Sequence, residues 1–199
     1  MVNIKGKSIS LYINIYKYIY ILMETNKRNI KNNKTKKNFV KYIFVYGAMI
    51  NKFQQKKTLG KYVKTYPVIL NKNFGYKRIF NACDNNITFL GLEKNSNYNT
   101  NINGLIIKLT SKKQYNNIKK REVVYKLINI PRQFFSFLKD ENINNKIYGF
   151  IPYKNAVCNN NDNISDKYVN TILNGCKYYG NDFMKEFINT TSNIPNKFK

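Results

Sequence analysis

Histidine and tryptophan are both absent from the 199 residues of this chain. Without histidine, Ser-His-Asp triads, HExxH zinc sites and zinc deaminase centres are excluded. Any acid–base catalysis must then use Glu, Asp, Lys, Tyr or Cys. Carboxylates are scarce as well, with 10 Asp plus Glu against 35 Lys plus Arg. The acidic residues are therefore few enough to be considered one at a time.

Cysteine is also rare, and its spacing is uninformative. Cys83, Cys158 and Cys176 are odd in number, widely separated and form no CxxC pair. This pattern predicts neither a disulfide framework nor a cysteine-based metal site. Nothing else in the sequence indicates a metal site, and we expect no cofactor.

The formal net charge of +25 points, at first sight, to nucleic acid or an anionic membrane as a partner. Asn, Lys, Ile, Tyr and Phe are all over-used, however, and all have A/T-rich codons. A biased genome raises these five residue types without any selected partner. The basic residues are scattered, apart from a cluster in 27–37. We therefore expect no specific nucleic-acid partner, and only weak, salt-sensitive binding to polyanions.

Residues 1–40 are predicted to be a basic, Asn- and Lys-rich extension. The apolar stretch 9–23 is interrupted by Asn14 and Lys17 and is too short and polar for a clear membrane span. Its position after two lysines resembles a signal peptide, but its alternation equally suits a strand. Targeting, disorder and a strand all stay open. We expect a cytoplasmic protein, or an organelle-targeted or secreted one, with membrane contact only if 9–23 is a signal or anchor.

The rest of the chain, with 43% hydrophobic residues overall, predicts one domain over 41–192 and a tail over 193–199. Apolar runs bounded by Gly and Asn predict strands. These lie in 41–50, 66–70, 87–93, 102–109, 121–130 and 146–153. Segments 95–101 and 155–163 are polar and read as a turn and a low-complexity loop.

Helices are expected between and after these strands. Ser111 and Gln114 fit the N-cap and N3 positions of a capping box. Ser165 precedes apolar residues at helical spacing from Tyr168 onward, and Asp182 is positioned to cap a final short helix. The order predicts an α+β fold, a small curled mixed sheet or barrel with flanking helices.

Four stretches occur in an order and spacing that resemble the γ-glutamylcyclotransferase-like superfamily, which includes the ChaC-type and AIG2-like proteins. They are the strand–turn motif FVYGAMINK (44–52), LNKNFGYKRIFN (70–81), INGLIIKLTSKKQYNNIKKREVVY (102–125) and YVNTILNGCKYYGNDFMKEFINTT (168–191). Together they cover most of residues 42–191. No motif is specific alone; the resemblance lies in their order.

The resemblance implies an enzyme that cyclises a small γ-glutamyl compound to 5-oxoproline and releases an amine or peptide. Glutathione, a γ-glutamyl dipeptide and a γ-glutamyl amine all remain possible substrates. The implied general base and acid is Glu122 in the Arg-Glu motif, and Tyr125 is an implied substrate contact. The implied substrate-binding turn comprises Val45, Tyr46, Gly47, Ala48, Met49 and Ile50.

The sequence also departs from the family pattern. Ala48 replaces the usual Ser or Thr, and Lys119 stands where Asp is common. These changes keep open a catalytically inactive binding or scaffold domain on the same fold. If 121–130 is a regular strand, Arg121 need not touch Glu122, because neighbours point to opposite faces. Arg78 is expected to be a solvated strand residue, with pairing to a substrate carboxylate as the alternative.

Overall fold

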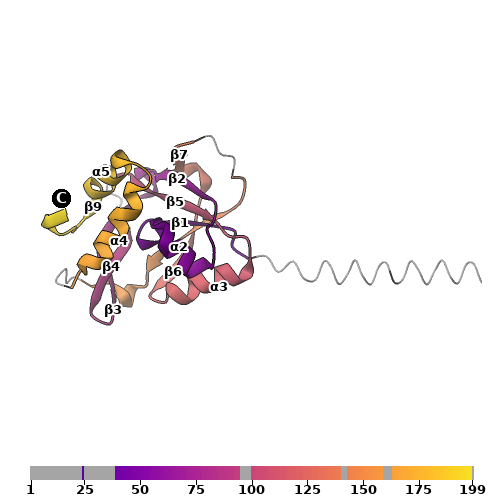
Figure 1. Ribbon diagram of the computed structural model, residues 1–199, viewed down its shortest axis with the longest axis horizontal. Coiled ribbons are helices and arrows are strands. Elements are labelled where there is room, and N and C mark those ends of the chain that lie inside the picture. The colour runs from indigo at the N-terminus through magenta and orange to yellow at the C-terminus, as the bar shows by residue number, and fades with distance from the viewer. Residues whose placement is uncertain (1–23, 25–38, 95–99, 140–142, 159–162, 199) are drawn as a thin grey trace, which may run out of the picture. The chain divides into compact units, whose positions relative to one another are not determined.

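The computed structural model describes residues 39–94, 100–139, 143–158 and 163–198, together with Glu24 (Figure 1). The expectations for the stretch 9–23 and for the turn 95–99 lie outside the described residues. Contacts divide the chain into two units, 1–38 and 39–199. No helix in the described ranges is long and apolar enough to cross a membrane.

The described strands form two sheets. Their bounds are β1 (Tyr42–Val45), β2 (Thr65–Leu70), β3 (Tyr76–Asp84), β4 (Ile87–Lys94), β5 (Ile102–Lys108), β6 (Tyr125–Ile130), β7 (Phe135–Phe137), β8 (Ile147–Pro152) and β9 (Thr191–Ser192). The larger sheet has the order β6-β8-β1-β5-β2-β7, and the smaller has the order β4-β3-β9. The larger sheet is mixed, since β1 pairs parallel with β8 and antiparallel with β5.

Helices connect and cover these strands. The described α-helices are α2 (Lys52–Leu59), α3 (Lys112–Arg121), α4 (Asp166–Lys177) and α5 (Asn181–Asn189). Short 3-10 helices are Ala48–Ile50, Lys72–Phe74, Arg132–Phe134, Lys154–Ala156 and Asn196–Phe198. Helix α2 packs against α3, and α4 packs against both α5 and the 3-10 helix Ala48–Ile50 (Figure 1).

The α+β class is confirmed, as a mixed sheet with flanking helices and no closed barrel among the described residues. Strand β1 occupies the middle of the larger sheet, and all four of its residues are buried. Such a run needs cover on both faces, which explains why its apolar residues are continuous rather than alternating. The six predicted strands correspond to β1, β2, β4, β5, β6 and β8.

The helix starts match the predictions in part. Ser111 Oγ accepts from the Gln114 N–H at 3.3 Å, while Gln114 Oε1 accepts from Thr110 N–H rather than from Ser111. Helix α4 follows Ser165, but that side chain makes no capping bond. Helix α5 begins one residue before Asp182 and is preceded by Gly180 at φ +112°. Glycine tolerates that backbone conformation without a Cβ clash.

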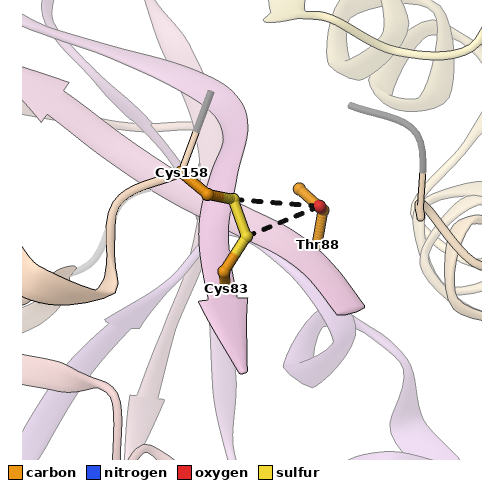
Figure 2. Close-up of a disulfide and its surroundings, with 3 residues drawn as sticks. All are labelled: Cys83, Thr88 and Cys158. Carbon is orange, nitrogen blue, oxygen red and sulfur yellow. Dashed lines mark hydrogen bonds between the residues drawn. A yellow bond between two sulfur atoms is a disulfide. The ribbon is translucent and has the colours of Figure 1, made fainter. Parts of the chain in front are cut away.

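The structure corrects the expectation about cysteines. Cys83 and Cys158 form a disulfide, with a Cα–Cα distance of 5.8 Å and a sequence separation of 75 (Figure 2). Cys83 lies on β3, and an antiparallel bridge between Ala82 and Val157 brings the chain before Cys158 alongside it. Spacing in sequence could not reveal this pairing because it depends on the tertiary fold. Cys176 is free and buried.

Arg78 is a second correction, since it is fully buried rather than solvated. Its guanidinium makes five hydrogen bonds to neutral acceptors. These are Asn103 O, Asn103 Oδ1, Phe187 O, Thr190 Oγ1 and Thr191 Oγ1, at 2.6–3.0 Å. The guanidinium carbon also lies 3.6 Å from the centroid of the Phe187 ring. Arg78 therefore joins β3 to Asn103 of β5 and to the segment 187–191.

Packed structure extends beyond the predicted domain limits at both ends. Phe39 and Val40 pack against the core although they were assigned to the extension. In the segment expected to be a tail, Ile194 is buried in the core and Lys197 Nζ lies 2.5 Å from Asp166 Oδ2. The apolar residues at 39, 40 and 194 explain why the packed unit is longer than predicted.

Candidate active site

The turn after β1 is built around Gly47. A Cβ at this position would lie 3.2 Å from the Tyr168 hydroxyl, so glycine permits a close approach of α4 to the turn. The 3-10 helix then closes with bonds from Ile50 N–H to Gly47 O (2.8 Å) and from Asn51 N–H to Ala48 O (3.1 Å). The Ile50 N–H is thereby occupied within the turn.

Asn51 fixes the position of this turn between two helices. Its Oδ1 accepts from Phe53 and Gln54 N–H groups and so caps α2. Its Nδ2 donates to Thr171 O of α4 at 3.0 Å. Gly175 of α4 lies so close that a Cβ there would be 2.6 Å from Asn51 N. The turn is consequently held rigidly against α4.

Glu122 is the C-cap of α3 and does not lie on a strand. Its N–H donates to Ile118 O at 2.9 Å, and its carbonyl accepts from Tyr125 N–H, where β6 begins. The expected alternation of faces therefore does not apply, and Arg121 Nε lies 3.3 Å from Glu122 Oε1. The sequence prediction started the strand four residues too early because Val123 and Val124 extend its apolar, β-branched pattern.

The structure brings Glu122, Tyr125 and most of the turn into one pocket of about 270 Å³. Its lining comprises Phe44, Val45, Tyr46, Gly47, Ala48, Met49, Asp84, Phe89, Leu90, Ile118, Arg121, Glu122, Val124, Tyr125, Phe150 and Tyr168. Ile50 is fully buried and does not contribute to this lining. Lys119 is not part of it either; its ammonium lies 5.9 Å from the Tyr115 ring centroid on α3.

The electrostatic environment of Glu122 favours a proton acceptor. Burial raises the pKa of its carboxyl above the ordinary glutamate value, and the Arg121 guanidinium opposes this shift without reversing it. A raised pKa makes a carboxylate a stronger base while it remains ionised near neutral pH. Asp84 is the other carboxylate in the lining.

Two phenol hydroxyls in the pocket donate hydrogen bonds to backbone carbonyls. Tyr46 donates to Phe150 O at 2.6 Å, and Tyr125 donates to Leu90 O at 2.8 Å. Burial raises the pKa of both residues, so they remain neutral. Their oxygens are then left as acceptors, and together with Glu122 they favour a ligand that donates hydrogen bonds.

Tyr168 is a pocket residue, although its sequence pattern indicates only an apolar position of a helix. Its ring packs edge-on against Phe80 and Phe89, with centroids 6.3 and 5.1 Å apart. Its oxygen accepts from Leu90 N–H at 3.4 Å. Burial raises its pKa, so the hydroxyl keeps its proton. Among the described residues this hydroxyl has no acceptor for that proton.

Comparison with solved structures places this arrangement among known folds. A protein described as gamma-glutamyl cyclotransferase superposes with a TM-score of 0.57 at 11% identity, over 79% of this chain and 95% of that one. The chain has the γ-glutamylcyclotransferase-like fold. The uncharacterized human protein loc79017 shares this fold at a TM-score of 0.53, with 12% identity over 79% of this chain and 95% of its own.

A third structure with the γ-glutamylcyclotransferase-like fold is YkqA from Bacillus subtilis. It matches at a TM-score of 0.51 and 14% identity, over 78% of this chain and 55% of that protein. No protein-family profile and no curated protein matches the chain by sequence. At identities this low the similarity establishes the fold, while the roles of the pocket residues rest on their chemistry.

Proposed function

We propose that the protein cyclises a γ-glutamyl compound to 5-oxoproline and releases the attached amine or peptide. The observation that carries the proposal is the position of Glu122. A partly buried carboxylate with a raised pKa faces the same pocket as the Tyr-Gly turn, on a γ-glutamylcyclotransferase-like fold. The small volume of the pocket suits the γ-glutamyl part of a substrate, with the rest extending outward.

The pocket chemistry suits the α-ammonium group of such a substrate. An ammonium has three N–H donors and no acceptor. The Glu122 carboxylate and the oxygens of Tyr46 and Tyr125 supply acceptors, because both phenols have already donated their protons. Binding of the ammonium beside Glu122 also positions its proton for transfer.

The reaction needs one proton relay and no water. Glu122 accepts a proton from the α-ammonium, and the free amine attacks the γ-carbonyl carbon of the same molecule. The new C–N bond closes a five-membered ring, Glu122 passes its proton to the leaving nitrogen, and the original γ-amide C–N bond breaks. Glu122 then takes the second proton from the ring nitrogen and passes it to the released amine, which leaves as an ammonium and regenerates the carboxylate. Orientation in intramolecular attack is worth up to about 7–11 kcal/mol, and a placed base adds roughly 10²–10⁴-fold.

The negative charge on the carbonyl oxygen requires a donor. Ala48 supplies no hydroxyl for this role. The Tyr168 hydroxyl accepts from the Leu90 backbone N–H, which leaves its own proton to be donated into the pocket. In this proposal Tyr168 donates to the developing oxyanion, the type of contact that can lower a barrier by about 3 kcal/mol.

Glu122→Gln tests the proposal, with Asp84→Asn as a matched control. Both substitutions neutralise a carboxylate of the pocket lining while preserving its shape. We expect Glu122→Gln to lower 5-oxoproline release by about 10²-fold or more, and Asp84→Asn to have a small effect. The assay measures 5-oxoproline from glutathione, γ-glutamyl dipeptides and γ-glutamyl amines. Equal activity in wild type and Glu122→Gln would show that Glu122 is not the base.

A binding or scaffold domain is the second candidate, and Ala48 is the observation that favours it. Lys119 carries less weight, because it does not line the pocket. The two candidates differ in one measurement. A non-catalytic domain binds a γ-glutamyl compound in calorimetry but releases no 5-oxoproline at any enzyme concentration.

A further inference from the structure

A second cavity, of about 480 Å³, lies between the start of α2, strands β2 and β7, and the residues after α4. Its lining comprises Lys52, Thr65, Tyr66, Pro67, Phe137, Lys139, Tyr178 and Tyr179. None of these residues lines the pocket of Glu122. We call this cavity the Lys–Tyr cleft. Its volume falls within the range of about 300–1,000 Å³ that is usual for small-molecule sites.

Lys52 is a partly buried cation in this cleft. Its ammonium donates to Thr65 Oγ1 at 2.8 Å and lies 5.6 Å from the ring centroids of both Tyr178 and Tyr179. Within the described part of the chain, no carboxylate forms an ion pair with it. Burial lowers the pKa of Lys52, because the ammonium has lost part of its hydration and no anion among the described residues replaces it. A bound anionic group would compensate that charge.

The tyrosine side of the cleft is exposed to solvent. Tyr178 is 70% exposed, although a large aromatic side chain would normally be partly covered. It meets Tyr179 edge-on at 5.1 Å, and Tyr179 is held in turn by a 3.1 Å hydrogen bond between its hydroxyl and Thr65 Oγ1. An exposed ring beside a cation offers a stacking surface for a planar group that also carries negative charge.

We propose that the Lys–Tyr cleft binds a nucleoside monophosphate, with the phosphate on Lys52 and the base stacked on Tyr178. Lys139, which also belongs to the lining, provides a second cation for the phosphate. Phosphate alone uses only the ammonium groups, and a nucleoside alone uses only the ring. A nucleotide uses both, and the bounded volume suits one nucleotide. This site is independent of the proposed cyclisation.

The test is calorimetric titration of the full chain with adenosine 5′-monophosphate, adenosine, inorganic phosphate and a single-stranded oligonucleotide. The monophosphate is expected to bind more tightly than adenosine or phosphate, by a factor of about ten or more, because stacking and charge each add to affinity. Equal binding of phosphate and the monophosphate would overturn the proposal. So would binding of the oligonucleotide without the monophosphate, or no binding of the monophosphate.

The chain offers a matched control for each contact. Lys56 lies 5.2 Å from the ring of exposed Tyr62, which repeats the lysine–tyrosine pairing outside the cleft. Lys52→Gln and Tyr178→Ala should each weaken monophosphate binding about tenfold, whereas Lys56→Gln and Tyr62→Ala should change it less than about twofold.

Lys52→Arg keeps the charge and should retain binding, which separates loss of the contact from loss of the fold. Equal weakening by Lys56→Gln and Lys52→Gln would show that the binding is non-specific attraction to a basic chain and would refute the site.

Discussion

Reduction of the Cys83–Cys158 disulfide should markedly destabilise the domain. The bond closes a loop of 75 residues in sequence. In the chain-entropy description, release of such a loop increases the freedom of the unfolded chain by about 4.5 kcal/mol at 25 °C. Domains of this kind typically have unfolding free energies of about 5–15 kcal/mol, so the loss would be a large fraction of the total.

The assay is urea unfolding of the full chain with and without a phosphine reductant. The control is the variant Cys83→Ala/Cys158→Ala, which keeps the buried Cys176 thiol. We expect the reductant to lower the unfolding free energy of the wild type by about 2–4 kcal/mol, because compactness of the unfolded chain reduces the ideal value. The double variant should have the same unfolding midpoint in urea with and without the reductant.

Two results would contradict this reasoning. If the wild type unfolds at the same urea concentration with and without reductant, and free-thiol titration confirms reduction, the cross-link does not restrict the unfolded chain. If the reductant destabilises the double variant equally, the effect arises elsewhere than at Cys83 and Cys158.

The remaining predictions concern the charges of Glu122, Arg121 and Arg78 and the N-terminal limit of the packed unit. Activity should fall with acidity at a pH above the ordinary glutamate pKa of about 4.3, because Glu122 must be ionised and burial raises its pKa. Arg121→Gln should move that limb of the pH–rate profile to still higher pH, since Arg121 lowers the Glu122 pKa. Arg78→Met should lower the unfolding free energy by about 3 kcal/mol or more, because several buried acceptors lose their donor. The control Arg132→Met should lower it by less, and thermal unfolding measures both. Deletion of 1–38 should change the unfolding free energy in urea by less than about 1 kcal/mol, because the packed unit begins at residue 39; a larger loss would assign core contacts to the deleted residues.

Local patterns were sufficient for the main strands and for the α+β class. Apolar runs with flanking Gly or Asn identified the strands that form the centre of the larger sheet. Helix α2 was missed because its residues Lys52–Leu59 carry almost no apolar stripe; it is held instead by the Asn51 cap and by buried Gln55, whose Nε2 donates to Met49 O. Strand β9 has only two residues and no pattern of its own.

The candidate site was predictable only through the order of its motifs. Glu122 and Tyr46 are far apart in sequence, and their approach depends on pairing between strands. Tyr168 had no signal beyond helical spacing, because its hydroxyl lies at the turn only once α4 packs against Gly47. Arg78 was misjudged for a related reason: its acceptors come from segments whose approach no local pattern encodes.

Arg78 also limits when the domain can complete its core during synthesis. The ribosome makes this residue early, in β3, but Phe187, Thr190 and Thr191 supply several of its acceptors near the C-terminal end. Until that end emerges, closing the core around β3 would bury a guanidinium with few partners, which is strongly unfavourable. We therefore expect the nascent chain to remain incompletely folded until residues 187–191 have been synthesised. A chain truncated before Thr190 should be recognised and degraded by quality-control proteases.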